Sequence, residues 1–160
     1  MARRSKTGRR SGERGFSYAV ALFAVAVLTI LTLRALENGA TKERREREAE
    51  LLFAGLAYRD AIGQYYEQSP GTVKHYPATL QALLLDERSS RTRRPLRRLY
   101  RDPVTLDTAW GIVKAPDGGV MGVYSLSGRA PVKSDAFPTG LEDFAGAASY
   151  RNWEFIYRPH

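Results

Sequence analysis

An unbroken apolar segment lies near the start of the chain, directly after a basic segment. Residues 16–33 hold 18 positions without a charged residue, a glycine or a proline. As an α-helix this segment would be about 27 Å long, close to the hydrocarbon thickness of a bilayer. A helix that is apolar on every face is buried either in a large protein or in a membrane. Because residues 34–160 are too few to enclose it, we predict a membrane-spanning helix.

The hydrophobic pattern changes after this segment to a single stripe on a polar helix. Opposite charges stand four residues apart at Lys42–Glu46, Glu43–Arg47 and Arg44–Glu48, which is typical of a solvated helical face. Apolar or small residues then recur at heptad-like spacing: Leu51, Gly55, Tyr58, Ile62 and Tyr65. The pattern predicts that the helix continues through residues 40–66 and ends at Ser69-Pro70-Gly71. Asn38-Gly39, between the two parts, favours a bend.

The remaining pattern predicts a small antiparallel sheet. Residues 80–85 are expected to form a short helix after Tyr76-Pro77. Two strands are expected at residues 110–114 and 120–126, with a hairpin turn at 116–119, because Pro-Asp-Gly-Gly separates two β-prone runs. A long loop rich in small residues leads from 127 to an aromatic last strand at 150–157. The predicted class is α+β, with a long N-terminal helix packed on the sheet.

The charges before the apolar segment predict its orientation in a membrane. Residues 1–15 carry six bases and one acid, a net charge of +5, and the positive-inside rule places this end in the cytoplasm. Without these residues the net charge of the chain falls from +8 to +3, which weakens any argument for nucleic-acid binding. A cleaved secretory signal fits less well, because its apolar core is usually about 7–15 residues and a small-x-small site follows it. The chain has no cysteine, so disulfides and thiol chemistry are excluded.

The junction between the two N-terminal segments resembles a known processing site. A short basic leader ending in Gly15, followed by Phe16 and an apolar helix, resembles the type IV prepilins and the pseudopilins of type II secretion systems. The resemblance extends more loosely to Asp102-Pro103 and Trp110-Gly111. It implies cleavage by a membrane aspartyl protease between Gly15 and Phe16, and methylation of the new terminus at Phe16. The implied pilin-like fold divides into a leader (1–15), a transmembrane helix (16–37), its amphipathic continuation (38–69) and a periplasmic globular part (70–160).

The resemblance implies a mechanical function rather than a catalytic one. The expected protein is a single-pass inner-membrane subunit that assembles into a short periplasmic filament driving protein export. The implied partners are other pseudopilins, the prepilin peptidase and the inner-membrane secretion platform, with no nucleic acid. The alternative is a permanently anchored single-pass protein whose basic periplasmic domain binds a partner. A secreted enzyme is a third hypothesis, but no residues support it.

One departure from the family lies at the fifth mature position. The family usually has Glu there, and this chain has Val20. In the assembled filament that carboxylate is thought to pair with the free amine of a neighbouring Phe, since a charge in an apolar core is costly unless paired. A subunit at the filament tip, with nothing above it, would not need the pair. Divergence without mechanistic meaning is the other interpretation, and the sequence leaves both open.

The residues outside the helix include two candidate binding features. Major pseudopilins bind calcium in the loop before the last strand, where this chain offers Asp135, Glu142 and Asp143. These are oxygen ligands of the right kind, but their spacing does not reproduce the family loop. We therefore expect no cofactor, with calcium as the one candidate.

The second feature is an arginine run. Residues 88–101 contain seven arginines, one tyrosine and no acid, which predicts an exposed segment anchored by Leu96, Leu99 and Tyr100. The run is either a simple solvated loop or a docking face for an acidic partner, for which the candidate residues are Arg91, Arg93, Arg94, Arg97 and Arg98.

No catalytic constellation is recognisable in the sequence. His75 and His160 lack metal-ligand neighbours at a useful spacing. The segment from Ser125 to Gly128 does not match a nucleophile elbow, because its first glycine is missing.

Overall fold

One long helix and a small sheet make up the fold. The computed structural model describes residues 13–89 and 92–159, with the backbone alone at 13–17 and 35–38. Helix α1 (Glu13–Glu67) is helical throughout, including Asn38-Gly39, where the sequence favoured a bend. The chain forms two compact units, divided between Lys42 and Glu43 within α1. The first twelve residues of the expected leader lie outside the described residues.

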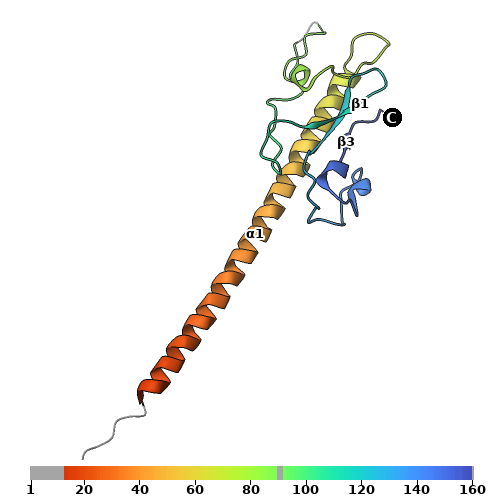
Figure 1. The fold of residues 1–160 in the computed structure, drawn as a ribbon. Coiled ribbons are helices and arrows are strands. Elements are labelled where there is room, and N and C mark those ends of the chain that lie inside the picture. Colours follow the sequence, from red (N-terminus) through yellow and green to blue (C-terminus); the bar gives the residue numbers. More distant parts are fainter. Residues whose placement is uncertain (1–12, 90–91, 160) are drawn as a thin grey trace, which may run out of the picture. The chain divides into compact units, whose positions relative to one another are not determined.

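The second unit combines the end of α1 with an antiparallel sheet, so the α+β class is confirmed. Its strands are β1 (Gly111–Lys114), β2 (Val120–Tyr124) and β3 (Phe155–Ile156), in the spatial order β1-β2-β3. Three short 3-10 helices complete it: η1 (Leu80–Leu83), η2 (Glu142–Phe144) and η3 (Tyr150–Asn152). The strands lie alongside the last turns of α1 (Figure 1).

The hairpin between β1 and β2 forms where the sequence predicted it. Gly111 pairs with Tyr124 and Val113 with Gly122, and an irregularity follows where Lys114 pairs with Val120. The turn needs a glycine because Gly118 has φ of 83°, in the left-handed region. The Asp117 carboxylate accepts the Gly119 N–H at 2.9 Å, which holds the turn closed.

Several predicted elements are shorter than expected, and the strand expected over 120–126 ends at Tyr124. The strand expected over 150–157 is a strand only at Phe155–Ile156, because Tyr150–Asn152 forms a 3-10 turn instead. The spacing of three between Tyr150 and Trp153 suits such a turn, which buries both rings. The helix expected over 80–85 ends at Leu83, since the chain beyond it pairs Asp86 with Arg93 in an isolated β-bridge.

The hydrophobic stripe of α1 forms one side of the core, as predicted. Leu51, Tyr58 and Ile62 are at most 1% exposed. Opposite them lie Val123, Trp153 and Phe155, each fully buried. Full burial of such side chains stabilises the fold by roughly 1.5–3 kcal/mol each.

Two glycines on α1 allow the helix and β3 to pack closely. A Cβ atom at Gly55 would lie 2.3 Å from the Phe155 ring, and one at Gly63 would lie 2.6 Å from the Tyr157 ring. Both distances are far inside van der Waals contact. Gly55, part of the predicted stripe, is therefore required for space, and the aromatic rings fill the room that the missing side chains leave.

Candidate functional site

The apolar segment of α1 is exposed on all sides within the first unit. Phe23 and Leu28 are 71% and 62% exposed, and an 18-residue window has a mean hydropathy of 2.3 with none of it buried. The hydroxyl of Thr29 donates to the Val25 carbonyl at 2.8 Å, so its polar group is satisfied within the helix. By length and composition this is one helix that could span a membrane.

The predicted processing site lies at the start of α1. Gly15 and Phe16 belong to the helix by backbone, and their side chains lie outside the described residues. Val20, one turn later, is an exposed apolar residue of the same segment. The chemistry expected of the junction therefore remains a prediction.

Glu48 fastens the long loop to α1, a role that the sequence analysis missed. Its side chain was expected on a solvated face, paired with Arg44, but only 4% of it is exposed. The carboxylate accepts the backbone N–H groups of Val132 at 2.7 Å and Lys133 at 2.9 Å. It also accepts the Tyr150 hydroxyl at 2.7 Å. The loop before β3 is thus tied to the helix by a buried acid.

The charge of Glu48 also acts on its tyrosine partner. Burial and then the hydrogen bond to Glu48 raise the pKa of Tyr150 to about 12. A sequence signal for Glu48 did exist, because the heptad-like stripe extended three residues backward from Leu51 reaches it. Extended four residues forward from Tyr65, the same stripe reaches Ser69, which is 5% exposed.

Arg88, the first arginine of the basic run, is a structural residue. Its guanidinium donates to both carboxylate oxygens of Asp86 at 2.8 Å and to the Tyr65 carbonyl at 2.7 Å. It also lies 3.3 Å from the centroid of the Tyr65 ring. The hydrogen bonds from Arg88 hold the pKa of Asp86 below its usual value. This arginine therefore closes the end of α1 and is not free for a partner.

The other described arginines of the run lie on the surface of the second unit. Leu96 anchors the segment, since it is buried and its N–H donates to the Leu83 carbonyl at 2.9 Å. Leu99 does not anchor it, because 37% of its surface is exposed. The exposed candidates in the described part of the run are Arg93, Arg94, Arg97 and Arg98, while Arg91 lies outside the described residues.

Asp102 and Ser125 form a buried polar pair. Asp102 is fully buried, and one carboxylate oxygen accepts the Ser125 hydroxyl at 2.6 Å. The other oxygen accepts the Val104 N–H at 2.9 Å, which builds the turn predicted at Asp102-Pro103. Ser125 is therefore committed to holding this turn against the end of β2.

The three candidate calcium ligands do not form a cluster. Asp135 is exposed in the loop, and Glu142 accepts the Gly140 N–H at 2.8 Å. Asp143 lines a surface groove between α1 and β3. Among the described residues, no group of three or more acids or histidines is arranged to hold a metal ion.

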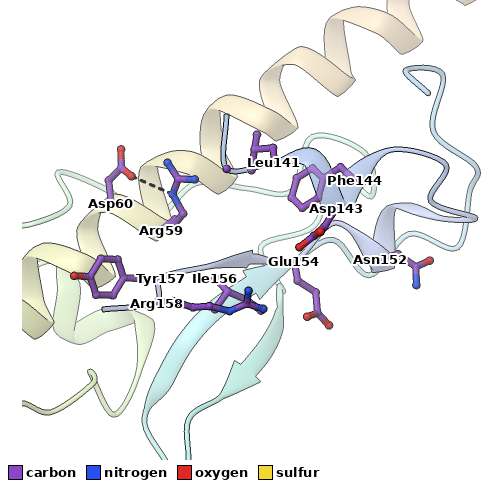
Figure 2. Close-up of a pocket in the computed structure, with 11 residues that line it drawn as sticks. Arg59, Asp60, Leu141, Asp143, Phe144, Asn152, Glu154, Ile156, Tyr157 and Arg158 are labelled. Carbon is purple, nitrogen blue, oxygen red and sulfur yellow. Dashed lines mark hydrogen bonds and ion pairs between the residues drawn. The ribbon is translucent and has the colours of Figure 1, made fainter. Parts of the chain in front are cut away.

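A groove lined by side chains of both charges lies between α1 and β3. It encloses about 470 Å³ and is lined by basic, acidic and apolar side chains. Figure 2 shows Arg59 and Asp60 projecting from α1 on one side, with Glu154 and Arg158 from the C-terminal segment across from them. Arg59 and Asp60 pair with each other at 3.3 Å. The groove therefore offers both signs of charge.

A second groove is basic and aromatic. It encloses about 510 Å³ and is lined by Glu50, Phe53, Ala54, Arg98, Leu99, Tyr100, Arg101 and Pro103. Of the predicted docking residues, Arg98 lines it directly. The described side chains of both grooves supply guanidinium groups, carboxylates and aromatic rings, which is the chemistry of binding surfaces.

Comparison of the chain with models of protein families, with curated protein sequences and with solved structures found no match in any of the three.

Proposed function

We propose that the chain is a pseudopilin-like subunit of a type II protein secretion system. The leader stays in the cytoplasm, the apolar part of α1 spans the inner membrane, and the globular unit lies in the periplasm. Cleavage after Gly15 and methylation of Phe16 prepare the subunit for a short filament that drives protein export. In this proposal the protein works by assembly and not by catalysis.

One observation carries the proposal: α1 is a single helix whose first part is apolar and exposed on every face and whose second part buries one stripe. Its apolar segment follows the Gly15-Phe16 junction, and its buried stripe forms the core with an antiparallel sheet. A pilin-like subunit requires this combination, because the helix both holds the subunit in the membrane and carries its globular part. The basic leader before the junction supports the stated orientation.

Processing at the junction tests the proposal directly. Mass spectrometry of protein extracted from membranes of cells that hold the peptidase should find a chain starting at Phe16 with a methyl group on its amine. Gly15→Leu should block cleavage, because the protease must approach the main chain closely there. Gly15→Ala is the matched control and should still be cleaved. An intact leader on the wild-type chain would contradict the proposal.

The orientation has its own test. A reporter that is active only in the periplasm, fused after His160, should be active. A reporter that is active only in the cytoplasm should be silent at the same position. The opposite result would place the arginine run in the cytoplasm and would reopen nucleic-acid binding.

The second candidate function is that of a permanently anchored protein that binds a partner through its basic domain. The basic aromatic groove beside Phe53 favours it, because an exposed apolar ring flanked by arginines suits a binding surface. The two functions differ at the N-terminus, since only the pseudopilin-like subunit loses its leader.

A further inference from the structure

Phe53 is an exposed aromatic residue on α1, whose other large apolar side chains in the second unit are buried or half-buried. It is 64% exposed, although Leu51 and Ala54 beside it are buried. Its ring meets the Tyr100 ring edge-on, with centroids 5.8 Å apart. An apolar ring held in water next to another aromatic side chain is a common feature of docking sites.

The wall of the groove opposite Phe53 is rigid. The Tyr58 hydroxyl donates to the Tyr100 carbonyl at 3.1 Å and accepts the Tyr100 N–H at 2.9 Å. The indole N–H of Trp110 donates to the same carbonyl at 2.9 Å. Tyr58 and Trp110 are buried core residues. The backbone at Tyr100 is therefore fixed before any partner arrives, which lowers the ordering cost of binding.

The rim of the groove is basic. The Arg98 guanidinium lies 5.3 Å from the centroid of the Tyr100 ring, and Arg97 next to it is exposed. In the described parts of the chain, no carboxylate forms an ion pair with Arg94, Arg97 or Arg98. Glu50 is the one acid among the residues that line the groove. A partner with carboxylates would therefore find unsatisfied positive charge around an apolar floor.

We propose that this groove, defined by Phe53, Arg98, Leu99 and Tyr100, binds an acidic segment of another protein. One apolar side chain of the segment packs against Phe53 and Leu99, and its flanking carboxylates pair with Arg97 and Arg98. The volume of about 510 Å³ accommodates a side chain and its neighbouring backbone. A flat lipid surface would use the arginines alone and would leave the hollow beside Phe53 unfilled. This inference does not depend on processing at Gly15.

A labelled peptide tests the proposal on the full chain. The chain is placed in nanodiscs of zwitterionic lipid, and a fluorescent peptide with one phenylalanine between acidic residues is added. We expect saturable binding that weakens as salt is raised, because exposed charges are screened. The same peptide with serine in place of its phenylalanine should bind at least about fivefold more weakly, as expected for an anchor residue.

Two pairs of variants locate the binding surface. Phe53→Ala should weaken peptide binding by at least about fivefold, and the joint change Arg97→Gln, Arg98→Gln should do the same. Val73→Ala, which shortens another apolar residue that is 61% exposed, is the control for Phe53. Arg158→Gln, in the mixed-charge groove, is the control for the arginines. Both controls should bind like the wild type, and because all five residues are exposed, every variant should retain the wild-type unfolding transition.

Several outcomes would overturn the proposal. Phe53→Ala binding like Val73→Ala would exclude the apolar anchor, and equal binding of the serine peptide would reduce the interaction to charge alone. Displacement of the peptide by phosphatidylglycerol vesicles, with no dependence on Phe53, would make the occupant a lipid surface. If the wild-type chain associates with itself in the absence of peptide and Phe53→Ala does not, the occupant of the groove would be a second copy of the chain.

Discussion

Two stretches of α1 share a helix but bury their side chains in opposite ways. In residues 18–33 the apolar side chains point in every direction and are exposed, with Leu28 at 62%. In residues 48–67 one stripe is buried, with Ile62 fully covered, while most exposed positions are charged or polar. The difference shows that the arrangement of apolar residues around a helix, more than their number, indicates what surrounds it. An all-round pattern is typical of a helix that can span a membrane, and a stripe is typical of a helix packed against one protein surface.

The largest expected effect comes from breaking the stripe. Ile62→Ala should lower the free energy of unfolding of the second unit by about 2–5 kcal/mol, because it leaves a cavity in the core. Leu28→Ala is the matched control and should change that unfolding by less than about 0.5 kcal/mol. Urea unfolding of the full chain in detergent, followed by tryptophan fluorescence, measures both. Equal losses of unfolding free energy in the two variants would mean that the two stretches do not differ in how they contribute to the core.

A charge placed among the apolar residues 18–33 tests the other stretch of α1. Val20→Glu should cost about 2–4 kcal/mol in membrane stability if the acid stays charged and unpaired, or be relieved by protonation of the acid. If the chain occupies a filament tip, secretion should be unchanged or reduced. Filament yield and secretion, compared with the wild type, are the measurements. Improved assembly would instead mean that the subunit repeats along the filament and lacks a carboxylate there.

Glu48 tests whether the polar end of the stripe belongs to the core. Glu48→Gln should destabilise the second unit by roughly 1–3 kcal/mol, since the amide cannot accept all three of its buried hydrogen bonds. Glu50→Gln, an exposed change two residues later, should have little effect on unfolding. If both changes had the same small effect, the loop before β3 would be held by its aromatic side chains alone.

The smallest predicted effect depends on pH. The folded-state pKa of Tyr150 is raised to about 12, above an unfolded value of about 10. Its contribution to stability is therefore complete below pH 10 and is lost as the pH rises through about 12. Tyr150→Phe should cost about 1 kcal/mol at neutral pH and should remove part of the late tyrosinate absorbance. Tyr157, whose pKa is also raised to about 12 by its hydrogen bond to Glu67, should account for another part.

The features that follow from local spacing or from turn residues could be predicted from the sequence. The stripe through Tyr58 and Ile62 and the hairpin at Gly118 follow from spacing and turn chemistry, and both are present. Glu48 was predicted to be exposed because it is charged, although its position continues the buried stripe. Arg88 was grouped with its neighbours because composition does not reveal that a tyrosine ring and Asp86 lie within reach.

Features that depend on distant partners were the hardest to predict. The aromatic run before the C-terminus satisfies a strand pattern, but a 3-10 turn at Tyr150 replaces the first part of the strand. The Tyr150 ring meets Trp153 edge-on, and the Trp153 ring stacks on Phe144. The basic aromatic groove needed the structure for a similar reason. Phe53 and Tyr100 are 47 positions apart, and no periodicity links them.

The contacts of Glu48 have a consequence for when the protein can fold. Its partners follow 84, 85 and 102 positions later in the chain. Contacts of such separation close large loops and form slowly compared with local ones. A chain whose first helix enters a membrane early would therefore keep its globular unit open until the segment with Tyr150 had followed. Completion of this unit is tied to arrival of the C-terminal segment, which in the proposed topology follows transfer of the chain across the membrane.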